Sequence, residues 1–296
     1  MLTFFSTPKP FLGHIDVIQR NALQSWKRVH PEAEIILFGD DPGAAEVCAE
    51  LNIRHEPGVK RNEHGTKYLR PIFDRAAELA RYNLLCYINC DVVLLDDFLP
   101  ALNSMLRLRK DFLMVGQRWD LDVREPLSFG SGWQTRLRDL ALSQGKQRPP
   151  QWIDYFAFSR DLYRNKLPPF VIGRPGWDNW LIWYARHAGF IVADATPAVV
   201  AVHQNHDYSY HPQGEAGVWH GAEAQKNYAL LENGRCFATM QNATHRLTNR
   251  GIRRNYRHYL VILQRRMRGV FDRFWFFSLD VTRPLRHALG LRKRGN

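Results

Sequence analysis

The chain has 296 residues, of which 45% are hydrophobic and 12% are aromatic. This composition can bury a full core as one large domain, with or without appendages, and it excludes a disordered protein. No basic segment precedes an apolar run of signal-peptide length, and no stretch stays uncharged long enough to cross a bilayer, so we expect an intracellular protein, cytoplasmic or peripheral on the inner face of the cell membrane. The four cysteines form no C-x-x-C pair, which argues against a zinc site and against disulfides.

The formal net charge of +12 is concentrated at the C-terminal end. Residues 246–296 hold 14 lysines and arginines and only two aspartates, which leaves 27 basic and 27 acidic residues in positions 1–245. We therefore predict two parts with different roles: a neutral catalytic or binding domain in 1–245, and a basic extension in 246–296 that is attracted to something anionic.

Apolar runs and helical spacings alternate along the first part of the chain. Strands are expected at 2–6, 34–41, around Ile53, at 84–88 and at 112–117, and helices at 14–29, from Pro42, at 69–81 and from near Asp96. Because repeated strand-helix units form mainly parallel sheets with helices on both faces, we predict an α/β fold of Rossmann-like type. Such sheets bind ligands beyond the carboxyl ends of their strands.

The pattern loosens after residue 120. A strand is expected at 152–159, a loop rich in proline and glycine at 168–177, a helix from Asp178 to about His187, and a last strand region at 190–206. There is no internal repeat and no low-complexity segment apart from the basic C-terminal part.

The most apolar strand, LLCYI, runs directly into Asn89-Cys90-Asp91. The side chains of Asn89 and Asp91 leave this strand on the same side, at the carboxyl edge of the sheet. Mg²⁺ and Mn²⁺ are typically held by one or two protein carboxylates together with substrate phosphates, so Asp91 is a candidate metal ligand. Alternatively, both side chains only cap the turn into the next helix.

Through this motif the sequence resembles the GT-A glycosyltransferases over about residues 2–210, with Asn89-Cys90-Asp91 in place of their D-x-D motif. The resemblance implies a GT-A type fold with a nucleotide-binding half in 1–100 and an acceptor-binding half in 101–245. It also implies that Asp91 binds a Mn²⁺ or Mg²⁺ ion that bridges the diphosphate of a nucleoside diphosphate sugar. The first motif position contacts ribose or metal-bound water in the family, and Asn89 gives this site one negative charge fewer than the usual aspartate.

The same resemblance implies roles for residues elsewhere in the chain. Thr7 and Asp40, which end the first two strands, correspond to positions that contact the nucleoside. A histidine near the end of the catalytic core often completes the metal site, and of the candidates His203, His206 and His211 we choose His203, because it follows a strand most closely. A structural hydrogen-bonding histidine is the alternative.

Asp178 and Asp154 are the two candidate catalytic carboxylates. Asp178 is expected at a helix start, where aspartate is a good N-cap. The resemblance implies more, since inverting members place there the base that accepts the proton of the acceptor hydroxyl. Asp154 lies in the apolar strand WIDYF, where a buried charge requires a partner, so it is a candidate for gripping donor-sugar hydroxyls or for a salt bridge.

Two further groups are candidates for binding the donor. Arg61, Asn62 and Thr66 belong to a polar loop before a helix, a place suited to diphosphate or base contacts, unless the loop is simply solvated. Arg118 ends a strand next to Trp119 and Asp120, and these three residues could bind a sugar by stacking and hydrogen bonding, although Trp119 could equally belong to the core.

The basic extension contains an apolar stripe at helical spacing between residues 256 and 274, followed by Trp275, Phe276 and Phe277. A basic amphipathic helix with aromatic residues suits an anionic membrane surface. The alternative is a helix that packs on the catalytic body with its arginines in solvent.

These features predict a metal-dependent glycosyltransferase (hexosyltransferase type) that moves a sugar from a nucleoside diphosphate sugar to a glycan or glycolipid acceptor, as in polysaccharide biosynthesis. We expect an inverting transfer, and a retaining mechanism is the alternative if Asp178 is not a base. A sugar nucleotidyltransferase is one alternative, but no glycine-rich phosphate loop lies near the first strand to support it. A non-catalytic nucleotide-sugar binding protein is another. Nucleic-acid binding through the basic extension is a third alternative, which we do not favour.

Overall fold

The computed structural model describes residues 1–208, 212–256, 263 and 267. The chain divides into two compact units, residues 1–255 and 256–296. The first unit extends beyond the boundary predicted after residue 245, because residues 245–254 form a hairpin that joins the sheet. The predicted amphipathic helix of the extension lies outside the described residues, apart from positions 256, 263 and 267.

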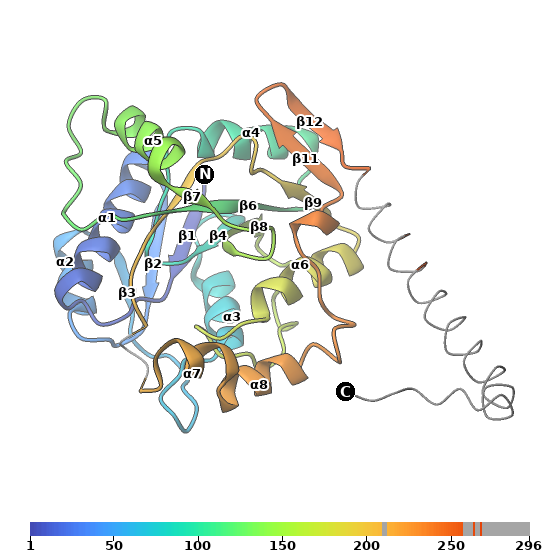
Figure 1. The fold of residues 1–296 in the computed structure, drawn as a ribbon, viewed down its shortest axis with the longest axis horizontal. Helices are drawn as coiled ribbons and strands as arrows, with labels where there is room; N and C mark the ends of the chain where they lie inside the picture. The colour runs from blue at the N-terminus through green and yellow to red at the C-terminus, as the bar shows by residue number, and fades with distance from the viewer. Residues whose placement is uncertain (209–211, 257–262, 264–266, 268–296) are drawn as a thin grey trace, which may run out of the picture. The chain divides into compact units, whose positions relative to one another are not determined.

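The first unit alternates strands and helices as predicted (Figure 1). Its strands are β1 (Thr3–Ser6), β2 (Glu34–Phe38), β3 (Arg54–Glu56), β4 (Leu84–Ile88), β5 (Val92–Val93), β6 (Phe112–Leu121), β7 (Lys146–Gln147), β8 (Ile153–Ser159), β9 (Ile191–Asp194), β10 (Ala201–Gln204), β11 (His245–Thr248) and β12 (Gly251–Arg254). Its helices are α1 (Gly13–Val29), α2 (Ala44–Glu50), α3 (Leu69–Leu79), α4 (Phe98–Leu108), α5 (Trp133–Gln144), α6 (Trp177–His187), α7 (Gly214–His220), α8 (Ala222–Ala229) and the 3₁₀ turn η1 (Met240–Asn242).

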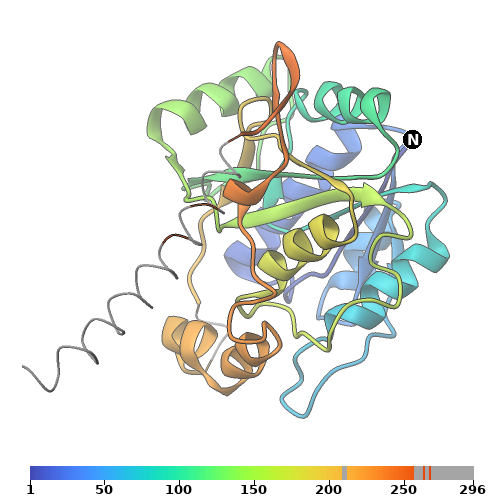
Figure 2. The same cartoon turned by 90° about the vertical axis from the view of Figure 1, so that its right-hand side faces the viewer.

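The strands form one mixed, mostly parallel sheet in the order β12-β11-β9-β6-β8-β4-β1-β2-β3, and β5, β7 and β10 pair off this path. Helices lie on both faces of it (Figures 1 and 2). The predicted α/β fold with a mainly parallel sheet is therefore confirmed. None of the helices in the described residues is long and apolar enough to span a bilayer.

Side-chain alternation along the buried strands divides the core into two layers. In β1, Phe4 packs with Trp26 of α1 and Phe98 of α4, whereas the next residue, Phe5, packs on the opposite face with Phe73 of α3. Strands buried on both faces need no polar alternation, which is why they read as continuous apolar runs in the sequence. The two layers hold the sheet rigid and leave its carboxyl edge to the polar residues.

Two strand pairings bring polar residues from distant parts of the chain to this edge. β8 runs antiparallel between β4 and β6, so its first residues, including Asp154, lie beside the carboxyl end of β4. β10 pairs with both β5 and β6, and this register places His203 opposite Val92 on one side and Asp120 on the other. The site is therefore assembled by long-range pairing.

Three helices and the β11–β12 hairpin were not predicted. Helix α5 buries only Leu137 and Ala141, so its apolar stripe is too narrow to produce a clear helical pattern. Helices α7 and α8 are short, with seven and eight residues. The sequence alone places the hairpin in the basic extension, because Arg246, Arg253 and Arg254 give it a basic composition.

The close approach of β6 and β8 yields a stability prediction. A Cβ atom at Gly116 would lie 2.1 Å from the hydroxyl oxygen of the fully buried Tyr155. We expect Gly116→Ala to lower the free energy of unfolding by about 1–3 kcal/mol through overpacking, as measured by denaturant unfolding.

Two further variants control this experiment. Gly58→Ala introduces a methyl group into open space, so it should leave stability unchanged within about 0.5 kcal/mol. Tyr155→Phe removes a buried hydroxyl that has no hydrogen-bond partner among the described residues, and it should restore part of the loss in the Gly116→Ala background. A Gly116→Ala protein as stable as the wild type would contradict the observed packing.

Candidate functional site

Asp91 lies at the centre of the polar carboxyl edge, in the turn between β4 and β5. Its backbone carbonyl accepts hydrogen bonds from the main chain and the side chain of Gln204, at 3.1 Å each. The carboxylate is buried, and its Oδ1 accepts no hydrogen bond from any residue that the structure describes. A buried carboxylate oxygen without a donor is well suited to a cation.

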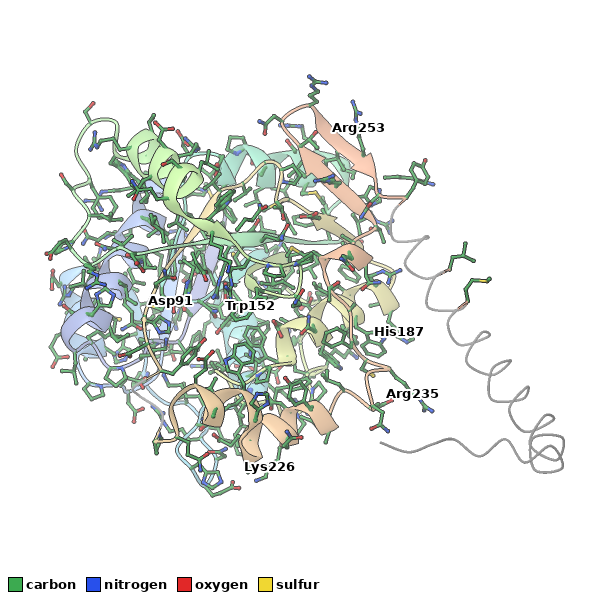
Figure 3. The ribbon with its side chains drawn as sticks, in the orientation of Figure 1. Asp91, Trp152, His187, Lys226, Arg235 and Arg253 are labelled. Carbon is green, nitrogen blue, oxygen red and sulfur yellow. The ribbon has the colours of Figure 1, made fainter. Side chains whose placement is uncertain are left out.

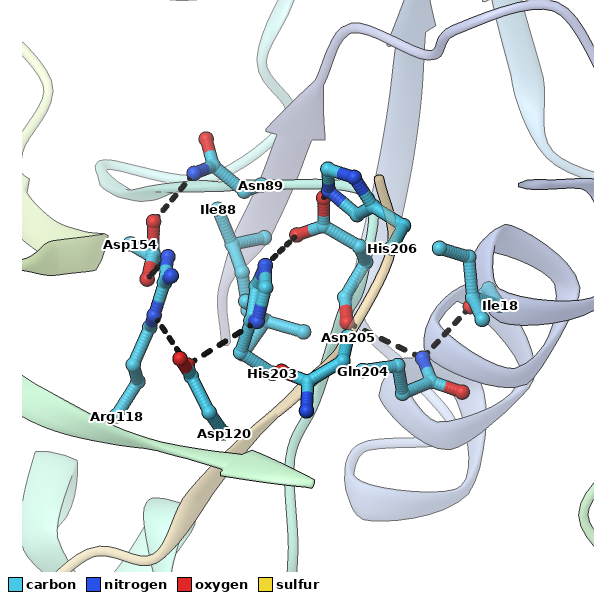
Figure 4. Close-up of polar contacts among 12 residues, drawn as sticks. Ile18, Ile88, Asn89, Arg118, Asp120, Asp154, His203, Gln204, Asn205 and His206 are labelled. Carbon is cyan, nitrogen blue, oxygen red and sulfur yellow. Dashed lines mark hydrogen bonds and ion pairs between the residues drawn. The ribbon is translucent and has the colours of Figure 1, made fainter. Parts of the chain in front are cut away.

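Two histidines direct ring nitrogens at this carboxylate (Figure 4). His203 Nε2 lies 3.9 Å from Asp91 Oδ1, and His206 Nε2 lies 3.2 Å from Asp91 Oδ2. The ligand atoms of these three residues all lie within 4.8 Å of one another, which is close enough to share one metal ion. The predicted ligands Asp91 and His203 are thus brought together, and His206, the candidate that we did not choose, lies nearer still.

The opposite nitrogen of each imidazole faces a hydrogen-bond acceptor. His203 Nδ1 lies 3.2 Å from Asp120 Oδ1, and His206 Nδ1 lies 2.7 Å from the carbonyl oxygen of Asp207. A metal ion would bind the Nε2 lone pair of each ring, while the opposite nitrogen faces these acceptors. The three residues therefore fit a divalent cation, and their two nitrogens favour Mn²⁺ over the harder Mg²⁺.

Lys9, which follows β1, adds a positive charge to this cluster. Its ammonium lies 3.6 Å from Asp91 Oδ2 and 2.8 Å from His206 Nε2. Burial by itself would raise the pKa of the Asp91 carboxyl, but His203, His206 and Lys9 outweigh it and hold that pKa well below its usual value. Asp91 is therefore ionised throughout the physiological pH range.

A second cluster surrounds the guanidinium of Arg118 on β6. Arg118 donates to Asp154 Oδ2 at 2.6 Å and to Asp120 Oδ1 at 2.8 Å, and Asn89 donates its amide to Asp154 Oδ1 at 2.6 Å. Burial would lower the pKa of Arg118, but the two carboxylates raise it above its ordinary value. Asn89 is thus hydrogen-bonded to a neighbouring carboxylate, and both oxygens of Asp154 already have donors.

Asp178 lies in the first turn of α6 and is half-buried. The N-cap position belongs to Gly176, whose φ of 103° suits glycine, and Asp178 Oδ1 accepts the backbone N–H of Gly176 at 3.2 Å. Burial and the negative charge of Asp154 together raise the pKa of Asp178 to about 7, although hydrogen bonds from backbone N–H groups partly oppose them. A carboxyl group that titrates near neutral pH can take a proton from a substrate.

The polar side chains of the loop at 61–67 form contacts with other parts of the chain. Arg61 forms ion pairs with Asp40 at 2.5 Å and with Asp41 at 3.6 Å. The Asn62 side chain closes its own loop by accepting the backbone N–H of Thr66 at 2.9 Å, and it donates to Glu223 at 2.6 Å. These bonds hold the loop against α8.

A single cavity of about 1150 Å³ connects these groups. It is lined by eleven residues that the sequence marked as candidates: Thr7, Arg61, Thr66, Asn89, Asp91, Arg118, Asp120, Asp154, Asp178, His203 and His206. Three other candidates among the described residues are not part of its lining: Asn62, Trp119 and the exposed Asp40, whose neighbour Asp41 lines the cavity instead. Figure 3 shows Asp91 and Trp152 in the interior of the view and Lys226 and Arg253 at its margin.

Sequence reasoning missed several residues that line the cavity. Lys9 stands between two prolines that indicated only the end of a strand, and Lys67 is a buried lysine that pairs with Asp41. Arg148 lies 4.0 Å from the ring of Trp152, which in turn lies 5.1 Å from Trp219. Of these residues, the sequence indicates only Trp152, which lies two positions before the candidate Asp154.

No protein-family model matches this sequence, and a comparison with curated protein sequences finds no match. Among solved structures, glucosyl-3-phosphoglycerate synthase from Mycobacterium tuberculosis, in complex with Mg²⁺ and uridine diphosphate, is similar with a TM-score of 0.46 and 16% identity. The similarity covers 80% of this chain and 79% of that chain.

Two further structures are similar over less of their own length. GalNAc-T7 with UDP, GalNAc and Mn²⁺ has a TM-score of 0.48 and 16% identity, and the match covers 78% of this chain and 48% of that chain. TarS 1–349 from S. aureus has a TM-score of 0.42 and 8% identity, with 69% of this chain and 58% of that chain covered. These structural neighbours are GT-A-type glycosyltransferases.

Proposed function

We propose that the protein is a divalent-metal-dependent glycosyltransferase that uses a nucleoside diphosphate sugar. The observation that carries this proposal is the convergence of Asp91, His203 and His206 at the carboxyl edge of the sheet, inside a cavity that also holds a carboxyl group titrating near pH 7. The same three ligands would also suit other borderline cations. Several basic side chains line this cavity, as a phosphorylated donor requires.

In the proposed reaction each cluster has a separate task. A bound Mn²⁺ or Mg²⁺ supplies positive charge to the diphosphate as the bond to the anomeric carbon breaks. Asp91 and the two Nε2 atoms hold that ion, and Asp120 orients His203. Asp154 is fixed between Asn89 and Arg118, so we assign it to positioning the donor sugar.

Asp178 is the proposed base of an inverting transfer. Its carboxylate accepts the proton of the acceptor hydroxyl while the hydroxyl oxygen forms its bond to the anomeric carbon and the nucleoside diphosphate leaves with the electrons of the broken bond. The pKa of about 7 supports this role, since the group is ionised in a useful fraction of molecules and still binds a proton. We propose a glycan or glycolipid acceptor.

The metal site yields the first test of this function. With Mn²⁺ and a panel of nucleoside diphosphate sugars and candidate acceptors, we expect release of nucleoside diphosphate, faster with Mn²⁺ than with Mg²⁺. Asp91→Asn should reduce the rate by about 100-fold or more, because the charged metal ligand is lost.

Asp40→Asn is the matched control, since Asp40 is exposed and lies outside the cavity lining, and it should retain nearly full activity. The enzyme proposal fails if no donor releases nucleoside diphosphate with any acceptor, or if Asp91→Asn and Asp40→Asn behave alike.

Asp178 yields a prediction for pH dependence. The transfer rate of the wild type should rise with pH and level off above about 7, since the base acts in its ionised form. Asp178→Asn should lower the rate by about 10²–10⁴-fold and leave Mn²⁺ binding intact. A variant that retains the wild-type rate and pH profile would exclude Asp178 as the base.

The same carboxyl group predicts an opposite effect on stability. Its folded-state pKa of about 7 lies above the ordinary value of 3.8, so the folded state gains stability from the protonated form, and this gain is lost as pH rises from about 4 to about 7. Asp178→Asn should therefore be more stable than the wild type at pH 8 by roughly 1–3 kcal/mol, with little difference at pH 4. Asp154→Asn, in contrast, should lower the free energy of unfolding by about 3 kcal/mol, because it removes one of the two carboxylates paired with the buried Arg118. Thermal or denaturant unfolding at the two pH values measures both differences.

We also propose that the basic segment 256–296 brings the enzyme to an anionic membrane on its cytoplasmic side. The support is the concentration of arginines in that segment. Full-length protein should bind phosphatidylglycerol vesicles at low salt and dissociate as salt rises, and replacing Arg257, Arg265, Arg266 and Arg268 with glutamine should weaken binding at least tenfold. Equal binding of the variant and the wild type in a sedimentation assay would rule out this role.

A further inference from the structure

Lys9 contacts, through its ammonium, the side-chain atoms of Asp91 and His206 that would bind a metal ion. Its ammonium is 2.8 Å from His206 Nε2 and 3.6 Å from Asp91 Oδ2, so it contacts two of the three ligands of the metal site. A divalent ion held by the same two atoms would lie within a few ångströms of this ammonium, and the repulsion between them is strong at that separation. Lys9 and the metal therefore compete for one place.

The backbone of Lys9 is held in position by a buried side chain. Gln19, which is 2% exposed, accepts the N–H of Lys9 at 2.7 Å and donates its amide to the carbonyl oxygen of Lys9 at 2.9 Å. Lys9 also lies between Pro8 and Pro10, which fix the neighbouring φ angles and restrict Lys9 to an extended conformation. The structure thus directs this ammonium into the cavity.

The charges of the site explain what this position can do. The negative charge of Asp91 and the positive charge of Lys9 cancel, and the imidazoles of His203 and His206 add no negative charge, so the site attracts a free divalent cation weakly. A diphosphate supplies both the missing negative charge and oxygen acceptors for a lysine ammonium. Its arrival would let Lys9 turn from Asp91 to the phosphate.

We propose that Lys9 makes metal binding conditional on the diphosphate of the donor: without a nucleoside diphosphate it blocks the metal ligands, and with one it binds the phosphate and releases them. This inference rests on the proposed function, since it takes the Asp91 site as the metal site. By linkage, the metal and the nucleoside diphosphate then strengthen each other's binding by the same factor.

The test measures binding rather than turnover. Free Mn²⁺ is quantified by electron paramagnetic resonance in titrations of the full-length protein without nucleotide, and UDP binding is measured by calorimetry at saturating Mn²⁺. Lys9→Met should bind Mn²⁺ roughly tenfold more tightly than the wild type, because the competing charge is gone. It should bind UDP roughly tenfold more weakly, because a charge-assisted hydrogen bond is lost. The affinity of Mn²⁺ for UDP in solution is common to all variants and cancels in these ratios.

Lys9→Arg is the matched control, since it keeps the positive charge, and it should keep both affinities near those of the wild type. Thermal unfolding of each variant shows that any change in binding is not a failure to fold. If Lys9 only neutralises a buried Asp91, Lys9→Met would tighten Mn²⁺ binding but leave UDP affinity unchanged, and that result overturns the proposal. Unchanged or weaker Mn²⁺ binding by Lys9→Met overturns it as well.

A double variant separates this inference from the proposed function. Lys9→Met combined with Asp91→Asn should lose the tight Mn²⁺ binding of Lys9→Met. If it keeps that binding, the metal is not held by Asp91, and the metal site of the proposed function fails together with the role of Lys9. If Asp91 is required in every background but Lys9→Met binds Mn²⁺ and UDP like the wild type, only the role of Lys9 is wrong.

Discussion

The guanidinium of Arg118 lies between the carboxylates of Asp154 and Asp120, and this ion-paired triad joins β6 to β8 across the carboxyl edge of the sheet. Removing one partner from such a buried group leaves an uncompensated charge, at a cost of about 3–5 kcal/mol. A hydrophobic replacement of the whole triad could pack equally well, so stability alone does not explain it. What the triad does provide is position: Asp120 faces His203, and Asp154 receives the Asn89 amide.

This network explains why an asparagine is suited to the start of the Asn89-Cys90-Asp91 turn. An aspartate there would place a second negative charge against Asp154, where the amide now donates a hydrogen bond at 2.6 Å. The metal site that we propose consequently has one carboxylate, and the imidazoles of His203 and His206 would supply its other protein ligands. The same three ligands would also suit Fe²⁺, but the lysine and arginines of the surrounding cavity favour a phosphorylated ligand.

The sequence predicted the parts of this protein that depend on local patterns. Continuous apolar runs located the main buried strands, and Asp91 was identified because it directly follows one of them. Contacts that depend on the pairing of distant strands could not be predicted from local patterns. Asp154 contacts Arg118 because β8 lies between β4 and β6 in the sheet. The residue pattern of β6 or of β8 does not indicate this strand order. The choice of His203 over His206 relied on distance from a strand, whereas in the structure both rings reach Asp91.

Two carboxyl groups in one cavity differ because their surroundings act in opposite directions. Burial opposes ionisation of both, but Asp91 has two imidazoles and an ammonium around it, whereas Asp178 has backbone N–H groups and the negative charge of Asp154 beside it. Asp91 is therefore a permanent anion suited to holding a cation, and Asp178 exchanges a proton near neutral pH. The inverting transfer that we propose uses both kinds of carboxyl group, one to hold the cation at the leaving diphosphate and one to accept the proton of the incoming hydroxyl. The opposite pKa shifts of these two carboxyl groups are the strongest physical support for the proposal that this cavity is catalytic.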